Sequence, residues 1–378
     1  MRSPSPPSPS PSPLVLLTGG KSAGHVFPAL AVGDELAGRG WRIAYAGLPD
    51  SMEERLAARR GLSFHPLAAR PVVGRGPLER VRALLTLLRS ALAARSLVRR
   101  LGARVVVATG GFVSAPTVIG AWLARRAVVL LEPNAEPGAA NRWLSRFADL
   151  AAVGHRETGA RLRCRAVHTG VPVRREFAAV PEIPAEDGPR RLLVLGGSQG
   201  AARLNAALPA ALAALPTQGA LEVLHQAGAD NLEATARAYR ERFDEPVPGR
   251  FRRGAVAVEL APFVDDVASA LARCHLVVSR AGAITLAELC AAGRGALLVP
   301  LRLAAGHQQA NARALAAAGA AVVVDEADLE RLGDLLAGLL GDLEGLREMG
   351  RRARSLGAPR AAADVADRVE ELVGRAAA

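Results

Sequence analysis

The sequence predicts an α/β protein built from two Rossmann-like domains, each a doubly wound parallel sheet, that face each other across a cleft. Short apolar runs alternate with longer Ala-rich segments of helical composition. The apolar runs lack in-and-out alternation, which indicates parallel strands covered on both faces. A glycine-rich turn follows an apolar run near the start of each half, at residues 19–25 and 196–201. Such a strand–turn–helix unit lets backbone N–H groups face an anion.

The order of the apolar runs predicts the strands of each sheet. The expected strands of the first half are residues 14–18, 42–46, 105–109, 127–131 and 150–153. Those of the second half are residues 192–195, 221–225, 256–260, 276–279, 296–300 and 320–324. Ligand sites of doubly wound sheets lie at the C-terminal ends of the strands, so we expect the turns after these strands to line one cleft.

The domain boundaries follow from changes in composition. A Ser/Pro tail that we expect to be disordered covers residues 1–13, and the first domain covers 14–175. The polar stretch 176–189 contains Pro and lacks periodicity, so it is the expected linker to a second domain over 190–358. A last helix within 359–378 could pack on either domain, including back on the first.

Composition narrows the functional class. The chain has 378 residues, 50% hydrophobic content and a formal net charge of +12, enough for two cores. Stacking aromatics do not accompany the basic residues, so no nucleic acid partner is expected, whereas an anionic membrane surface or a phosphorylated substrate fits the charge. Cys164, Cys274 and Cys290 are scattered, as in reduced cytosolic proteins. No signal peptide or membrane-spanning stretch is expected.

The first glycine turn carries a candidate base. Gly19, Gly20 and Gly24 allow a tight turn, and His25 would lie at the start of the following helix, where the helix dipole keeps an imidazole neutral. A helix-capping or packing histidine is the alternative. A Walker A loop is excluded, because it requires glycine where Val15 stands. A dinucleotide site is disfavoured because no acidic residue ends the second strand.

The second half carries candidate groups for a phosphorylated sugar. The turn at 196–200 offers Ser198 to a phosphate, and Glu288 lies over one turn into the helix after the next glycine turn, where it can accept two ribose hydroxyls. Gln308 and Gln309 could bind sugar hydroxyls. The alternatives are a plain strand–helix connection, a solvated glutamate and surface glutamines. No Asp-x-Asp pair occurs, so N–H groups, helix dipoles and Arg174 would have to neutralise a leaving diphosphate without metal.

A basic segment lies within the first half. Residues 70–104 contain nine arginines and one acidic residue, and Val81, Leu84, Leu85, Leu88 and Leu92 follow a helical spacing. Either these apolar side chains face the core and the basic face is solvated, or part of the helix lies on anionic lipid.

Taken together, these motifs resemble the MurG family of peripheral membrane glycosyltransferases. The resemblance covers nearly the whole chain after the tail. The matching segments are residues 24–30, 110–116, 196–201, 263–266, 279–288 and 307–312. It implies a GT-B fold whose C-terminal domain holds UDP-GlcNAc, with no cofactor and no metal.

The resemblance also implies site residues. On the donor side these are Ser198 with Ala283, Ile284 and Thr285 near the diphosphate, Val264 for uracil, Glu288 for ribose, and Gln308 and Gln309 for GlcNAc. Leu286 and Ala287 are further implied substrate-binding residues. On the acceptor side they are Ser22, Ala23, Gly24, Asn134 and His25, the implied base, while Arg174 is the family's arginine after a Gly-x-Pro turn. The chain departs from the family in a first loop that is one residue longer and contains Lys21, and in a Leu-Glu-Pro-Asn segment at 131–134.

The implied activity is inverting transfer of GlcNAc from UDP-GlcNAc to the 4-hydroxyl of MurNAc in undecaprenyl-diphospho-muramoylpentapeptide (lipid I). The products would be lipid II, for peptidoglycan synthesis, and UDP. The implied location is the cytoplasmic face of the cell membrane. Other cell-wall synthesis proteins are possible partners there. The alternatives are another GT-B enzyme, such as a UDP-GlcNAc 2-epimerase or a glycolipid glycosyltransferase, and a non-catalytic nucleotide-sugar binding protein.

Overall fold

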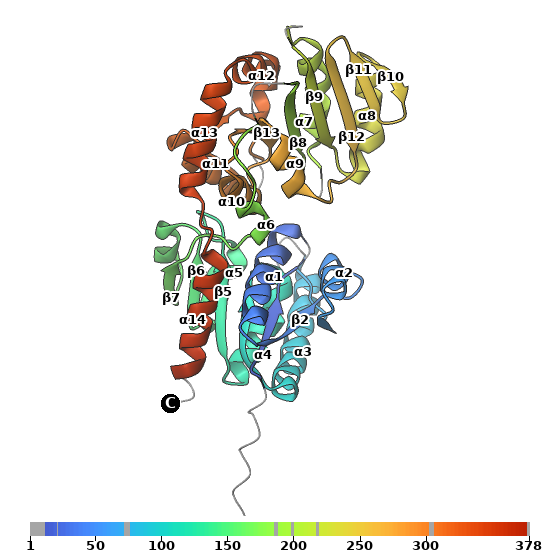
Figure 1. Cartoon of the computed structure of the whole chain (residues 1–378). Coiled ribbons are helices and arrows are strands. Elements are labelled where there is room, and N and C mark those ends of the chain that lie inside the picture. The colour runs from blue at the N-terminus through green and yellow to red at the C-terminus, as the bar shows by residue number, and fades with distance from the viewer. Residues whose placement is uncertain are drawn as a thin grey trace, which may run out of the picture.

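Two sheets, one parallel and one mainly parallel, each with helices on both faces, make up the two halves of the chain (Figure 1). The structure is a computed structural model that describes residues 12–20, 22–71, 76–184, 188–197, 200–216, 219–301 and 306–375. Most of the predicted Ser/Pro tail, together with Lys21 and Ser198, lies outside these residues. The predicted fold class, two doubly wound α/β domains, is confirmed.

The first sheet is parallel throughout. In spatial order its strands are β3 (Ser63–Pro66), β2 (Arg42–Gly47), β1 (Leu14–Thr18), β4 (Ala103–Ala108), β5 (Ala127–Glu132), β6 (Leu150–Val153) and β7 (Arg165–His168). The apolar runs predicted β1, β2, β4, β5 and β6 to within two residues at each end. The edge strands β3 and β7 were missed, because they are four residues long and lack buried side chains.

The second sheet repeats this order and adds an antiparallel edge. Its strands in spatial order are β10 (Asp244–Val247), β11 (Arg250–Arg253), β12 (Val256–Ala261), β9 (Leu221–Gln226), β8 (Arg190–Leu195), β13 (Leu276–Ser279), β14 (Ala296–Leu298) and β15 (Ala321–Val323). From β12 to β15 all pairs are parallel, whereas β10 and β11 pair antiparallel. The sequence did not predict this hairpin, whose strands are polar and largely exposed.

Helices cover both faces of each sheet. Those of the first half are α1 (Ala23–Gly38), α2 (Met52–Arg59), α3 (Pro77–Leu101), α4 (Gly111–Leu123) and α5 (Ala139–Leu144). Those that follow are α6 (Arg175–Ala178), α7 (Ala202–Ala213), α8 (Leu232–Arg240), α9 (Val267–Arg273), α10 (Ala283–Ala292), α11 (His307–Ala317), α12 (Leu332–Gly341), α13 (Leu343–Leu356) and α14 (Ala361–Arg375). Four apolar clusters result, one on each face of each sheet.

Helix α3 packs with its small residues inward and its large apolar residues outward. Ala91 and Ala94 are buried, and a side chain on Gly120 of α4 would collide with them. On the opposite side Leu78, Val81, Leu84, Leu85, Leu88 and Leu92 are each 50–65% exposed, and we call these six residues the leucine stripe. The alternative that this periodic face points into the core is therefore wrong.

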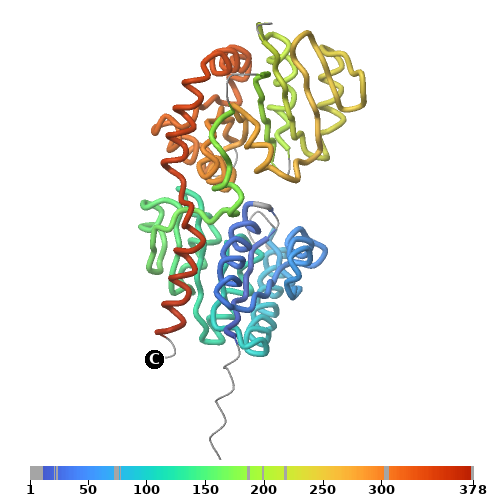
Figure 2. Tube along the Cα trace, viewed as in Figure 1, coloured from blue at the N-terminus to red at the C-terminus, as the bar shows by residue number. Residues whose placement is uncertain are grey.

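The last helix returns to the first domain. Val365, Ala366 and Val369 of α14 are buried in the cluster on one face of the first sheet, and Nη1 of Arg39 on α1 donates to Asp367 at 2.7 Å. Figure 2 shows the C-terminal segment running from the second domain down along the first.

The two connections between the domains lie side by side. Gly170, which has a φ of +75°, lies against Ala358 so closely that a side chain at Gly170 would overlap it. The predicted linker, 176–189, is not a free segment where it is described, because Phe177, Val180 and Ile183 are buried among residues of the second domain.

A buried arginine fastens the connection to the second domain. Arg294 is 1% exposed, and its guanidinium donates to six backbone carbonyls at 2.8–3.4 Å. These carbonyls belong to Leu271 and Ala272 at the end of α9, Ala292 and Gly293 at the end of α10, and Pro181 and Glu182 of the connection. Helix C-termini carry partial negative charge, so they stabilise a buried cation.

We expect Arg294→Met to lower the free energy of unfolding by about 3 kcal/mol, because the buried carbonyls lose their donors while the volume is nearly kept. Urea denaturation measures this. The matched control is Arg237→Met on the exposed face of α8, which should stay within about 0.5 kcal/mol of the wild type. Equal stability of the two variants would contradict a stabilising role for the buried guanidinium.

Candidate active site

The N-terminal ends of α1 and α10 meet where the carboxyl edges of the two sheets face each other. A side chain atom built on Gly24 of α1 would lie 3.8 Å from Cγ1 of Ile284 on α10. Beside them, the amide oxygen of Asn311 on α11 accepts a hydrogen bond from the N–H of Ala135 at 3.1 Å. The turns after the strands of both sheets therefore contribute to one cleft, as predicted from the topology.

His25 is the third residue of α1, at the position the sequence predicts. Its Nδ1 lies 3.0 Å from the carbonyl oxygen of Thr109, at the end of β4. A carbonyl only accepts, so Nδ1 carries the proton and a neutral ring leaves Nε2 as an acceptor. Thr109 also donates its hydroxyl to the His25 carbonyl at 2.6 Å. The first contact orients the ring and the second holds the main chain of His25, while Gly111 leaves room beside Nε2.

The other residues of the first loop lie in the same helix start. Ser22 is the N-cap of α1, and its carbonyl accepts from the N–H of His25 at 3.0 Å. Ala23 and Gly24 are the first two residues of α1. The hydroxyl of Tyr45 donates to the carbonyl of Gly19 at 2.6 Å, which anchors the described part of the loop to β2.

Asn134 is held at the end of β5 by a buried carboxylate. Glu132 is 1% exposed, and it accepts from the backbone and side-chain N–H groups of Asn134 at 3.0 and 2.9 Å. The N–H of Gly138 and the amide of Asn141 also donate to it, each at 2.9 Å. Asn134 in turn accepts a long hydrogen bond, 3.4 Å, from Asn311 of the other domain. Glu132 was not predicted to position Asn134.

Glu288 is buried rather than solvated, so the alternative of an exposed helix glutamate is wrong. Glu288 is the sixth residue of α10 and is 9% exposed. Its Oε1 lies 3.5 Å from Nη2 of Arg174. Burial raises the pKa of Glu288 to about 7, and the neighbouring Arg174 guanidinium opposes this rise only in part.

Arg174 joins elements of both domains. Its guanidinium lies between the rings of Phe27 on α1 and Phe177 on α6, 4.7 and 4.6 Å from their centroids. It also pairs with Glu176 at 3.1 Å. The side chain is 18% exposed, so Arg174 is not a free surface arginine. Stacking on two rings and pairing with two carboxylates hold the cation beside Glu288.

The remaining donor-side residues lie on two helix starts. Ala283, Ile284, Thr285, Leu286 and Ala287 form the first half of α10, whose first N–H groups have no acceptor within the helix. Gln308 and Gln309 are in the first turn of α11; Oε1 of Gln308 accepts from the N–H of Leu301 at 3.0 Å. Oε1 of Gln309 is buried without a hydrogen-bond partner among the described residues.

Val264 follows β12, and its backbone N–H donates to Oε1 of Gln226 at 3.1 Å. The other end of the same amide, Nε2, donates to the carbonyl of Gly197 at 3.1 Å. The sequence did not predict a role in the site for Gln226, Thr109 or Glu132. All three end, or directly follow, a strand at its C-terminal end, and that position was the available signal.

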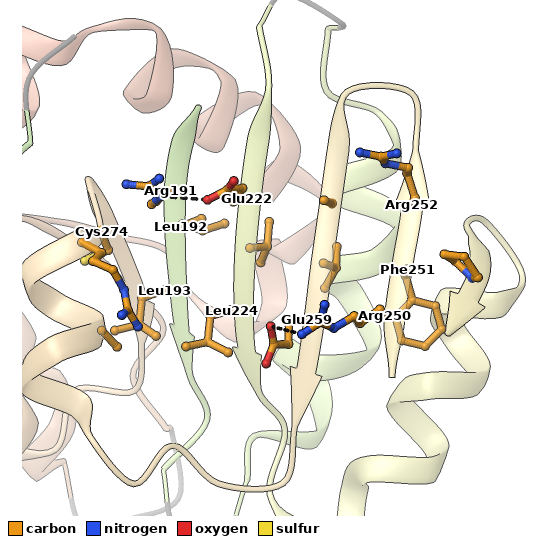
Figure 3. Close-up of a pocket in the computed structure, with 16 residues that line it drawn as sticks. Arg191, Leu192, Leu193, Glu222, Leu224, Arg250, Phe251, Arg252, Glu259 and Cys274 are labelled. Carbon is orange, nitrogen blue, oxygen red and sulfur yellow. Dashed lines mark hydrogen bonds and ion pairs between the residues drawn. The ribbon is translucent and has the colours of Figure 1, made fainter. Parts of the chain in front are cut away.

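A separate pocket lies away from these residues. It covers about 640 Å³ on the flank of the second sheet and contains none of the predicted site residues. Figure 3 shows it on a face of β8, β9, β12 and β11, with Leu193 and Leu224 at its floor and the Arg191–Glu222 and Arg250–Glu259 ion pairs beside them.

Within the described ranges, no group of three or more His, Cys, Asp or Glu side chains is arranged to bind a metal ion. Across the same residues, no helix is both long enough and apolar enough to cross a membrane.

Family models match both halves of the chain. Residues 14–153 match the glycosyltransferase family 28 N-terminal domain, and residues 191–369 match the glycosyltransferase family 28 C-terminal domain. The two matches together cover most of the sequence, and each contains the glycine turn of its half.

Similar proteins of known name share nearly the whole length. A UDP-N-acetylglucosamine--N-acetylmuramyl-(pentapeptide) pyrophosphoryl-undecaprenol N-acetylglucosamine transferase of Ectopseudomonas mendocina is 41% identical over 364 residues, which are 95% of this chain and 98% of that protein. The protein of the same name from Bordetella pertussis is 39% identical over 370 residues, 96% of this chain and 98% of its own.

Solved structures agree with these relatives. The crystal structure of MurG from Acinetobacter baumannii superposes with a TM-score of 0.75 at 30% identity, covering 96% of this chain and all of that one. A UDP-GlcNAc 2-epimerase from Neisseria meningitidis superposes with a TM-score of 0.65 at 12% identity, covering 95% of this chain and all of that one, and shares the fold alone. With two matching family models and relatives near 40% identity over nearly its whole length, the chain belongs to glycosyltransferase family 28.

Proposed function

We propose that this protein transfers GlcNAc from UDP-GlcNAc to the 4-hydroxyl of MurNAc in lipid I, with inversion at the anomeric carbon, forming lipid II and UDP. The relatives of about 40% identity are named for this transfer. The structural observation that carries the proposal is the meeting of α1 and α10 across the cleft. It places a candidate base, His25, on the helix that faces the helix of Glu288.

His25 is suited to remove the acceptor proton. Its Nδ1 is committed to the Thr109 carbonyl, so Nε2 takes the proton of the 4-hydroxyl while that oxygen forms a bond to the anomeric carbon. The bond from the anomeric carbon to the diphosphate oxygen breaks, and UDP leaves with the electron pair. Acceptor-side contacts come from Ser22, Ala23, Gly24 and Asn134.

The leaving diphosphate is stabilised by N–H groups and a cation. The free N–H groups at the start of α10 and the turn that contains Ser198 are the proposed donors, with Arg174 as the cation. In the structure Arg174 contacts Glu288, so ribose hydroxyls that bind Glu288 displace this ion pair and free the guanidinium for the diphosphate. Uracil is proposed to bind at the backbone near Val264, and GlcNAc at Gln308 and Gln309.

The acceptor carries an undecaprenyl chain, and the leucine stripe of α3 is the proposed membrane contact at the cytoplasmic face. Exposed Arg80, Arg82 and Arg89 flank the stripe. Trp122 of α4 and Trp143 of α5, 50% and 38% exposed, lie on neighbouring helices. Large apolar side chains flanked by arginines, with tryptophans nearby, suit an anionic bilayer surface.

Product analysis separates this function from its alternatives. The purified protein is incubated with UDP-GlcNAc and a lipid I analogue, and products are identified by mass spectrometry. Formation of the disaccharide lipid and UDP supports the proposal. Epimerised sugar with no change in the lipid would identify a 2-epimerase, and binding of UDP-GlcNAc without turnover would identify a binding protein.

We expect His25→Ala to reduce kcat at least 100-fold, because the attacking hydroxyl loses its base, while UDP affinity changes less than about twofold. Steady-state assays and calorimetric titration with UDP measure the two quantities. His168→Ala, at an exposed histidine of β7, is the control and should retain full activity. Full activity of His25→Ala would remove His25 from the mechanism.

Because ribose binding is proposed to need the ionised form of Glu288, we expect the KM for UDP-GlcNAc to depend on pH. A carboxyl with a pKa of about 7 is increasingly protonated below pH 7, and the acid accepts ribose hydroxyls less well than the carboxylate. The KM for UDP-GlcNAc should therefore rise as pH falls from 8 to 6, by up to about tenfold per unit below the pKa. Glu288→Gln should have a high KM that is flat over this range; a wild-type slope in that variant would count against the ribose assignment.

Removing part of the leucine stripe should weaken membrane binding. The double variant Leu85→Ser/Leu88→Ser replaces two side chains, each worth on the order of 2 kcal/mol when buried. Flotation with phosphatidylglycerol-containing vesicles should fall at least tenfold. Val247→Ser, at an apolar residue of β10 that is 52% exposed, is the control and should float like the wild type. Undiminished flotation of the double variant would place the membrane contact elsewhere.

A further inference from the structure

Gln226 occupies a central place among the strands that form the donor side of the cleft. It is the last residue of β9, which lies between β8 and β12. In the ladder it pairs with Leu195 on one side and Ala261 on the other. The loops that leave both neighbouring strands therefore start beside it. The side chain is buried, with 4% of the residue exposed.

The amide of Gln226 links these two loops. Oε1 accepts from the backbone N–H of Val264, after β12, and Nε2 donates to the backbone carbonyl of Gly197, after β8, each at 3.1 Å. A peptide N–H only donates and a carbonyl only accepts, so the amide has one orientation that satisfies both. No carboxylate or hydrocarbon side chain of this length makes both bonds.

The backbone of Gln226 strengthens the link to the glycine turn. Its carbonyl accepts from the N–H of Gly196 at 3.2 Å, so main chain and side chain both contact the turn. Gly197 has a φ of +81°, a conformation that favours glycine. Gln226 therefore contacts Gly196 and Gly197 through its main chain and its side chain, and it contacts Val264 through its side-chain amide.

We propose that Gln226 is a positioning residue that sets the spacing between the uracil and diphosphate subsites. This inference rests on the proposed function, which puts uracil at the Val264 backbone and the diphosphate at the 196–201 turn. The nucleotide joins these subsites through its ribose and needs both at a fixed separation at once. Fixing them before the ligand arrives removes an ordering cost from binding.

The hydrogen bond between Gln226 and Val264 also bears on how the base is recognised. The Val264 N–H is already bonded to Gln226 in the structure. Uracil that docks at this backbone therefore meets a peptide whose orientation Gln226 has fixed. Gln226 acts on the ligand through the two loops, and touches neither sugar nor acceptor.

The test compares ligands that fill one subsite or both. Calorimetric titration with uridine, pyrophosphate and UDP is carried out on the wild type, Gln226→Leu and Gln226→Glu, with thermal unfolding on each. Gln226→Leu loses both hydrogen bonds, and Gln226→Glu turns a carboxylate oxygen toward the Gly197 carbonyl. Both variants should bind UDP about tenfold more weakly or worse, while uridine and pyrophosphate affinities change less than about twofold. In assays KM should rise similarly and kcat should change little.

A purely structural role would lower the unfolding temperature without changing the ratio of UDP to uridine affinity. Glu222→Leu, on the same face of β9 and 54% exposed at its side chain, is the control and should bind all three ligands like the wild type. An unchanged ratio in both Gln226 variants overturns the inference and leaves the proposed function intact. A wild type that fails to bind UDP overturns both.

Discussion

Parallel strand pairing is the constraint on which the rest of this structure depends, because it gathers the carboxyl ends of all paired strands at one edge of a sheet. Each domain has such an edge, and the two edges face each other. Groups that are far apart in sequence, such as His25 and Thr109 or Gln226 and Val264, become neighbours for this reason. The antiparallel hairpin of β10 and β11 lies at an outer edge and leaves this arrangement untouched.

The cleft is lined by groups whose hydrogen-bonding capacity is largely committed. His25 is tied through one nitrogen, and Glu132 accepts four hydrogen bonds before any ligand arrives. Arg174 and Glu288 satisfy each other across the domain boundary. A buried carboxylate with no partner would be costly, and the partners of Glu132 and Glu288 offset part of that cost. Ligands then exchange one set of partners for another.

Much of the fold was predictable because buried parallel strands appear in the sequence as continuous apolar runs. The strands that the sequence missed, β3, β7, β10 and β11, are short and polar, and only their neighbours stabilise them. Helix α3 shows a different limit. The sequence shows the helical spacing of its large apolar residues. The face that packs inward, however, is the one with small residues, which fit against Gly120. For the site, glycine turns located His25 and Glu288, whereas the burial of Glu288 and the two-ended contact of Gln226 depend on tertiary neighbours.

The close contact of Gly170 with Ala358 has a mechanical consequence. The chain leaves the first domain and returns to it at adjacent points, so both covalent connections lie on one side of the cleft. Relative motion of the domains is then a rotation about an axis near these two residues, and atoms move farther the more distant they are from it. Arg294 holds the connection rigid beyond Val180, and α14 is fixed on the first domain by Arg39. We expect the backbone torsions that change in such a rotation to lie next to Gly170 and Gly357, between these anchored parts.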